Sequence, residues 1–129
     1  MDPMLDIATQ PVIALWGEAV RARRIQGERI TLAVVELDPN ADLPSHTHEA
    51  EQAGLCIQGS ITFDNDGQVR TLGPGGAWAV KSGRPHKAVA GPEGAIVIET
   101  FTPVRADWDA LRADPPSAPR WPVGADAGT

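Results

Sequence analysis

Apolar and polar residues alternate along most of the chain between residues 29 and 101, in short runs rich in β-branched side chains. This period of two is typical of strands that bury one face. We therefore predict strands in the runs 29–38, 52–58, 60–66, 68–80, 86–91 and 94–101, with a glycine-rich turn dividing the run 68–80. Many short strands at regular spacing favour a closed or double-sheet all-β fold.

Glycine and proline mark the turns between these runs. Asn-Asp-Gly at 65–67 is a strong hairpin signal, because these residue types tolerate positive φ angles. Gly59 is expected to separate two paired strands. Gly-Pro-Glu-Gly at 91–94 is expected to form the turn between the last two strands.

The C-terminal part of the chain has a different character. Only the segment 105–113 is expected to be helical, with Asp107 as a possible cap and Trp108 on its apolar face. The proline-rich tail after it is predicted to be extended or disordered, although Trp121 can dock it onto the body. With 129 residues the chain suits one domain. We divide it into an N-terminal strand or arm region (1–27), a barrel core (28–104), and a C-terminal helix and tail (105–129).

Composition narrows the classes of partner. A formal net charge of −6 disfavours nucleic acid or an anionic membrane, since either requires a basic face. No apolar run approaches the length that crosses a bilayer, and the acidic first ten residues do not resemble a secretory signal. The single cysteine, Cys56, excludes an internal disulfide and suits a reducing compartment. We therefore expect a soluble, cytoplasmic protein.

The chain has three histidines, and two of them are separated by a single residue. On a strand His46 and His48 would point the same way, and Gln52 has the same parity. Two imidazoles on one face are a common way to hold a divalent metal. The alternative interpretation is that two surface histidines lie near a turn, so the pair alone does not decide.

The wider spacing favours the metal site. The pattern is Asn40-x5-His46-x-His48-x3-Gln52-x6-Gly59 and then, after 15 residues, Gly75-x5-Lys81-x-Gly83-x2-His86. This pattern resembles the paired signature motifs of the cupin family, and the resemblance covers roughly residues 28 to 105. It implies a double-stranded β-helix, the jelly-roll barrel in which the two motifs form adjacent hairpins. It also implies that a divalent metal, whether manganese, iron, cobalt, nickel or zinc, binds at His46, His48, Gln52 and His86.

Three residues depart from the family pattern. Asn40 replaces a glycine, which is a mild change because asparagine tolerates a left-handed turn, and Lys81 replaces a proline. Gln52 stands where most cupins carry glutamate, and a strand bulge would allow Glu51 to be the ligand instead. Neutral ligands leave the charge of the metal uncompensated. This favours polarisation of a substrate oxygen over oxygen-dependent redox chemistry.

The last predicted strand carries a charge inside an apolar run. Glu99 shares a face with Val97 and Phe101, and burial on that face would raise its pKa into a range useful for acid–base chemistry. A solvent-facing Glu99 on an edge strand is equally compatible with parity. Arg105 can bind a carboxylate at the barrel mouth, but an ordinary ion pair with Asp107 is the simpler interpretation.

A narrower resemblance bears on these residues. The segments HTHEAEQ (46–52) and ETFTPVRADW (99–108) are similar to small cupins related to the pectin-degradation protein. Those enzymes act on 4,5-unsaturated uronates, with three histidines and a glutamine as metal ligands, and help the ring open to a linear keto-aldehyde. The resemblance implies that Glu99, where aspartate is usual, moves a proton. It implies that Phe101 and Arg105 bind substrate.

These observations predict a metal-dependent enzyme acting on a small, carboxylated, sugar-like substrate. The alternatives are a non-catalytic binding or sensing barrel and an iron-dependent dioxygenase. The resemblance to family members that pair through their outer sheets implies a homodimer. Cys56 is expected to be a small core residue, and Trp16 and Trp78 are expected to fill the core or a dimer interface rather than serve as a stacking platform.

Overall fold

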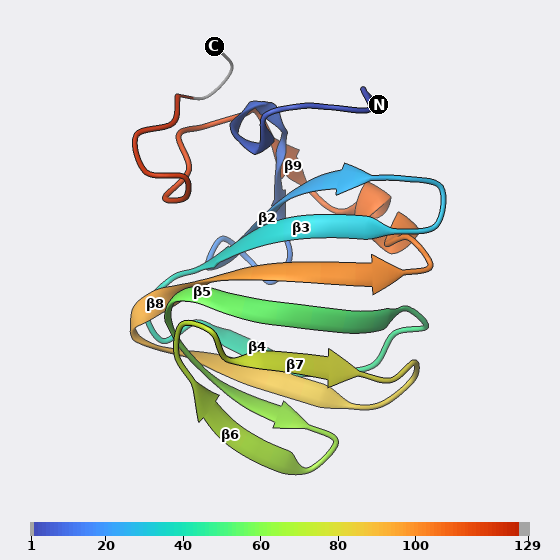
Figure 1. Ribbon diagram of the computed structural model, residues 1–129, viewed down its shortest axis with the longest axis vertical. Helices are drawn as coiled ribbons and strands as arrows, with labels where there is room; N and C mark the ends of the chain where they lie inside the picture. The colour runs from blue at the N-terminus through green and yellow to red at the C-terminus, as the bar shows by residue number, and fades with distance from the viewer. Residues whose placement is uncertain (1, 127–129) are drawn as a thin grey trace.

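The computed structural model describes residues 2–126 and is built almost entirely from β-strands (Figure 1). The described elements are η1 (Ile7–Thr9), β1 (Val12–Ala14), β2 (Val20–Gln26), β3 (Thr31–Leu37), β4 (Asp42–His46), β5 (Glu51–Asn65), β6 (Gln68–Leu72), β7 (Ala77–Val80), β8 (His86–Thr102), η2 (Ala106–Ala110) and β9 (Ala113–Asp114). The predicted all-β fold class is confirmed. Among the helices of residues 2–126, none is long and apolar enough to cross a membrane.

Two long strands, β5 and β8, pair along their whole length and join two layers. The first half of β5 and the second half of β8 lie in one layer, between β7 on one side and β3, β2, β1 and β9 on the other. The other halves of β5 and β8 form the second layer with β6 and β4. The two layers therefore close around a common interior, which is the core (Figure 1).

The bends in β5 and β8 correct two predictions. Gly59 does not separate two paired strands but lies inside β5, at register shifts against β8. Its φ angle is +75°, and a Cβ atom there would overlap with the carbonyl oxygen of Gly94. The segment 91–94 likewise belongs to β8 and bends it instead of ending it. These bulges carry each strand from one layer into the other.

The local turn signals are accurate. β5 and β6 are joined by the two residues Asp66 and Gly67, both with positive φ, as the Asn-Asp-Gly sequence predicted. Asn40 also has a positive φ of 60°, in keeping with its replacement of a glycine. The helix expected over 105–113 is shorter, a 3-10 helix over Ala106–Ala110, and Asp107 does not cap it.

Inward-facing side chains of both layers fill the interior. Cys56 is fully buried, as predicted, and Trp78 is buried and stacks on Phe63 with a ring separation of 5.0 Å. At one end this interior opens into a pocket, which contains the candidate site.

The C-terminal tail is docked on the outer face of the sheet by polar contacts. Glu36 is buried there, with Oε1 accepting hydrogen bonds from Arg23 (3.1 Å) and from the backbone N–H of Arg120 (2.7 Å). Arg23 also donates to the carbonyl oxygen of Ser117. Trp121, the residue expected to dock the tail, is 36% exposed. The tail is therefore held through Ser117 and through Arg120, the neighbour of Trp121.

Candidate metal centre

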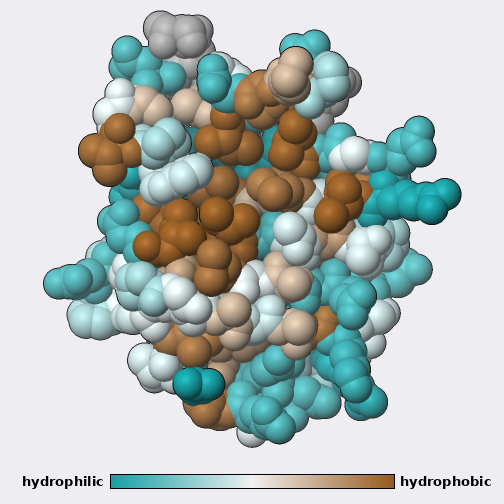
Figure 2. All heavy atoms as spheres, viewed as in Figure 1, coloured by the Kyte–Doolittle hydropathy of each residue, from teal (hydrophilic) through white to brown (hydrophobic). Residues whose placement is uncertain are grey.

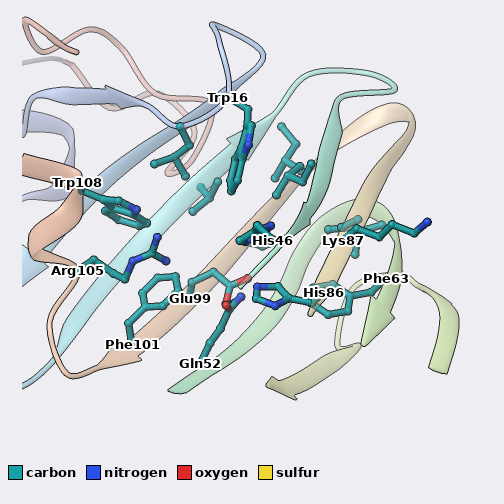
Figure 3. Close-up of a pocket in the computed structure, with 17 residues that line it drawn as sticks. Trp16, His46, Gln52, Phe63, His86, Lys87, Glu99, Phe101, Arg105 and Trp108 are labelled. Carbon is teal, nitrogen blue, oxygen red and sulfur yellow. The ribbon is translucent and has the colours of Figure 1, made fainter. Parts of the chain in front are cut away.

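Three histidines from different elements converge at one end of the barrel interior. His46 is the last residue of β4, His48 lies in the loop that follows, and His86 is the first residue of β8. One ring nitrogen of each lies within 4.8 Å of the others, so together they can hold a metal ion. The rings of His46 and His86 lie beside Gln52 in the pocket, with centres 4.2 Å apart and planes tilted by 57° (Figure 3).

Strand alternation does not explain how His48 reaches this cluster. β4 ends at His46 and β5 begins at Glu51, so His48 belongs to no strand. The loop turns back, and His48 Nδ1 donates to the carbonyl oxygen of Ala50 at 2.8 Å. Parity within one continuous strand was therefore the wrong reason to expect the two histidines together.

Backbone hydrogen bonds fix all three imidazoles in the same tautomer. Nδ1 of His46 lies 2.8 Å from the carbonyl oxygen of Pro44, and Nδ1 of His86 lies 3.0 Å from that of Arg84. His48 makes the equivalent bond described above. A carbonyl oxygen only accepts, so each Nδ1 must donate a proton, and Nε2 of each neutral ring keeps its lone pair. Such backbone partners commonly orient histidine ligands of metals.

The converging atoms at the centre of the cluster are all hydrogen-bond acceptors. His48 Nε2 lies 3.1 Å from His86 Nε2 and 3.0 Å from Gln52 Oε1. Lone pairs this close repel one another unless a cation or a proton lies between them. Imidazole nitrogens with an amide oxygen suit a first-row divalent metal, so the residues present fit such an ion.

Burial keeps the imidazoles neutral at physiological pH. It lowers the pKa of His46 to about 4, against a smaller opposing effect of the bond to Pro44. The pKa values of His48 and His86 are also lowered, chiefly by desolvation. Neutral imidazole is the form that binds metals, so the rings are ready to act as ligands.

Gln52, and not Glu51, faces the cluster. Gln52 is buried on β5, whereas Glu51 is exposed. The amide nitrogen of Gln52 donates to Glu99 Oε2 at 3.0 Å, which leaves its oxygen directed at His48. No strand bulge is needed to supply a fourth group.

Glu99 faces the interior from β8 and is only 6% exposed, which excludes the solvent-facing alternative. Its carboxyl group accepts hydrogen bonds from Gln52 and from the indole N–H of Trp78, at 3.0 Å to Oε1. Burial raises the pKa of Glu99 to about 8, although these two hydrogen bonds oppose the shift. The site thus contains a carboxyl group that can hold a proton near neutral pH.

A mostly apolar pocket adjoins the cluster and is lined by His46, His86, Gln52, Glu99, Phe101, Arg105, Trp16 and Trp108, among others (Figure 3). The empty space between the lining side chains, including solvent at the mouth, is about 540 Å³. The pocket therefore brings imidazoles, a carboxyl group and a guanidinium to one concave surface.

Arg105 both pairs with Asp107 and lies in the wall of the pocket. Its Nε and one terminal nitrogen donate to Asp107 at 3.0 Å, and this pairing lowers the pKa of Asp107. The guanidinium carbon also lies 4.7 Å from the ring centre of Phe101 and 4.8 Å from that of Trp108. The group is therefore held rigidly in the pocket wall, with its other terminal nitrogen free of the bonds to Asp107.

Trp16, which the sequence led us to expect in the core or a dimer interface, lines the pocket. It lies in the loop between β1 and β2, half-buried, with its ring centre 4.7 Å from that of His46. Loop residues have no periodic pattern from which a direction can be read. The adjacent Gly17, with a φ angle of +61°, is the one local sign of the turn that brings Trp16 over the pocket.

A model of the cupin domain family (Cupin_2) matches residues 33–101, more than half of the chain. The chain therefore belongs to the cupin family, and its fold is that family's jelly-roll barrel, as its two motifs predicted.

Three solved structures are similar along most of the chain. An RmlC-like cupin from Shewanella frigidimarina shares 22% identity at a TM-score of 0.77, covering 84% of this chain and 96% of that one. KdgF from Halomonas sp. shares 26% identity at a TM-score of 0.69, covering 74% and 88%. The polyketide cyclase RemF from Streptomyces resistomycificus shares 23% identity at 0.68, covering 80% of each chain. Among curated proteins, none matches the sequence.

Proposed function

We propose that this cupin is a metal-dependent enzyme that acts on a small, carboxylated, sugar-like molecule, of which a 4,5-unsaturated uronate is the leading candidate. The observation that carries the proposal is the convergence of three imidazoles and an amide oxygen beside a pocket that also holds a buried carboxyl group and a guanidinium. Ring opening of such a uronate requires a bound carboxylate, a polarised ring or hydroxyl oxygen, and a transferable proton.

In this proposal His46, His48, His86 and Gln52 hold the divalent metal. When bound, the metal supplies a Lewis acid that polarises a hydroxyl or ring oxygen of the substrate. All four ligands are neutral, so they leave the charge of the ion undiminished. This supports polarisation in preference to the iron-dependent dioxygenase chemistry considered from the sequence.

Arg105 binds the substrate carboxylate. Asp107 and the flanking rings of Phe101 and Trp108 fix its guanidinium, so little side-chain entropy is lost when the carboxylate is bound. The terminal nitrogen that is not bonded to Asp107 is the available donor. A charge-assisted hydrogen bond of this kind contributes about 1.5–3 kcal/mol.

Glu99 moves the proton. Its carboxyl group lines the same pocket as Arg105 and lies next to a metal ligand, so a substrate held by both would lie within its reach. Phe101 lies between Glu99 and Arg105 in the sequence and lines the same pocket. It provides an apolar wall that limits water at the reacting atoms.

One similarity in sequence and one in structure, both to the same group of cupins, support this choice of substrate. Segments 46–52 and 99–108 resemble the small cupins related to the pectin-degradation protein, and the fold is similar to that of KdgF from Halomonas sp. at 26% identity. The similarity to RemF at 23% identity supports the fold alone.

The test is a spectroscopic assay with a 4,5-unsaturated galacturonate, following loss of the ultraviolet absorbance of its conjugated double bond. The metal-loaded protein is expected to accelerate this loss, and His48→Ala is expected to abolish the acceleration. Glu99→Gln should lower it by about 10²–10⁴-fold, the usual contribution of a general acid or base. Glu49→Gln, at an exposed position, is the matched control and should leave the rate unchanged.

Absence of acceleration by protein with confirmed metal occupancy would contradict the uronate proposal. Binding of the uronate without turnover would then favour the sensing alternative. Oxygen consumption by the iron-loaded protein would favour the dioxygenase.

A further inference from the structure

We propose that Trp78, acting through Glu99, is a positioning residue that turns the oxygen rather than the nitrogen of the Gln52 amide toward the metal centre. The inference rests on the proposed function, because it concerns how one proposed ligand of the metal is oriented. It assigns a role to a tryptophan that neither touches the histidines nor lines the main pocket.

The three side chains form one continuous chain of hydrogen bonds. Trp78 Nε1 donates to Glu99 Oε1 at 3.0 Å, Gln52 Nε2 donates to Glu99 Oε2 at 3.0 Å, and Gln52 Oε1 lies 3.0 Å from His48 Nε2. All three residues are buried, so bulk water does not compete for these bonds.

The Gln52 amide needs such a partner. Its oxygen and nitrogen have nearly the same size and shape, so packing alone does not distinguish the two orientations. In its ionised form Glu99 accepts and does not donate, so in that form it selects the orientation in which the amide nitrogen faces it, as in the 3.0 Å bond from Gln52 Nε2. The amide oxygen is then left for the metal.

Trp78 holds the carboxyl group of Glu99 in this orientation. The indole is itself fixed by stacking on Phe63, with rings 5.0 Å apart and 19° from parallel. Its N–H is a donor only and lies 3.0 Å from Oε1 and 3.3 Å from Oε2, so it holds both carboxyl oxygens in place with Oε2 facing Gln52 Nε2. Oε1 can accept a second hydrogen bond, which leaves Glu99 free to serve a substrate as well.

The surrounding strands leave space for these hydrogen-bonded side chains. Gly54 of β5 is the register partner of both Trp78 on β7 and Glu99 on β8. A Cβ atom at Gly54 would overlap with the indole nitrogen of Trp78 and with Glu99 Oε2. Since Gly54 has a negative φ, its lack of a side chain serves this close approach and not a turn.

The hydrogen bonds from Trp78 through Glu99 to Gln52 predict an unusual result for the variant E99Q. The introduced amide has oxygen on one side and an NH2 group on the other. In either orientation this NH2 group faces a donor, which is the indole N–H in one orientation and the amide nitrogen of Gln52 in the other. If the introduced oxygen accepts from Trp78, the introduced NH2 group faces Gln52. The amide of Gln52 then rotates and presents its nitrogen to the metal. In W78F/E99Q the indole donor is gone, so the introduced oxygen can accept from Gln52, and the original orientation returns.

The experiment measures Co²⁺ binding to the full chain, by calorimetry and by the visible absorption bands of the bound ion. E99Q should weaken Co²⁺ binding by about 10- to 100-fold, the range for loss of a group that orients a ligand, and should alter the absorption bands. W78F/E99Q should regain most of the affinity and the wild-type bands. Trp121→Phe makes the same substitution in the tail and should match the wild type.

The outcomes separate this inference from the proposed function. No Co²⁺ binding by the wild type would contradict the metal centre itself. Wild-type binding by E99Q, or a double variant as weak as E99Q or weaker, would overturn the positioning role while leaving the metal centre intact. Melting temperatures of the variants identify any loss of affinity that comes from unfolding.

A second measurement needs no variant. In a ¹H–¹⁵N spectrum of the wild type, the indole resonance of Trp78 should shift when Zn²⁺ binds. The reason is that hydrogen bonds link the indole N–H through Glu99 to Gln52, a proposed ligand of the metal. The indole of Trp121 should not shift. An unchanged Trp78 resonance in the Zn²⁺-saturated protein would overturn the inference.

Discussion

At the scale of single residues, the site is defined by which atom each polar group presents. Backbone carbonyls take the Nδ1 protons of the histidines, and Glu99 takes the amide protons of Gln52, so only acceptors remain at the centre. The sequence predicted the residue types, because the histidine spacing is local information. It did not predict the orienting partners, since Pro44, Ala50 and Arg84 contribute only backbone oxygens, which any residue provides.

The choice between the adjacent residues Gln52 and Glu51 can be tested directly. Gln52→Ala should weaken binding of a divalent metal by about tenfold or more, because one of four ligands is lost. Glu51→Ala should leave it unchanged, since that side chain is exposed. Calorimetric titration with Zn²⁺ measures both. Weakening by Glu51→Ala alone would show that the carboxylate is the ligand.

Arg105 provides a second test at this scale. Arg105→Lys keeps the positive charge but loses the planar group that pairs with Asp107 and stacks between aromatic rings. The KM for a carboxylated substrate should rise by about tenfold or more, as expected for a lost charge-assisted hydrogen bond of about 1.5–3 kcal/mol. Steady-state kinetics measures this change. An unchanged KM would assign Arg105 to structure alone.

At the scale of elements, residue types predicted the tight turn correctly, but the sequence pattern did not show where a strand continues through a glycine. The hairpin at 65–67 was predicted correctly because its φ angles depend on the local residue types. Gly59 carries the same local signal but lies within β5, because pairing with β8 continues on both sides of it. Whether a glycine ends a strand or bends it depends on a partner about 35 residues away, which local pattern does not include.

The packing of β5 against its neighbours gives a test at this scale. Gly54→Ala should destabilise the fold by about 1–3 kcal/mol, since its methyl group would overlap with Trp78 and Glu99 across two strands. Ala53→Ser is the matched control on the exposed face and should change stability by less than about 0.5 kcal/mol. Urea denaturation measures both. Equal stability of the two variants would contradict the close approach at Gly54.

At the scale of the whole molecule, the outer face of the larger layer is unusually apolar. Leu32 and Leu55 are 36% and 39% exposed, and Leu55 is the register partner of Ile98 on β8. Figure 2 shows apolar residues gathered across the middle of this face. Such a patch suits an interface, and the homodimer predicted from the sequence remains our expectation.

Oligomeric state tests that expectation. The wild type should be a dimer by size-exclusion chromatography with light scattering, and Leu55→Glu should shift it to monomer by placing a charge in the interface. Val69→Glu, at an exposed position of β6, should leave the dimer intact. A monomeric wild type would contradict the expectation without affecting the metal centre.

The central claim is that a divalent metal is held by three imidazoles and the Gln52 oxygen. The most direct measurement is an anomalous difference map from crystals of the Co²⁺-loaded protein. We predict one strong peak within bonding distance of His46, His48, His86 and the amide oxygen of Gln52. A peak elsewhere, or no peak in protein that carries Co²⁺ in solution, would contradict the claim.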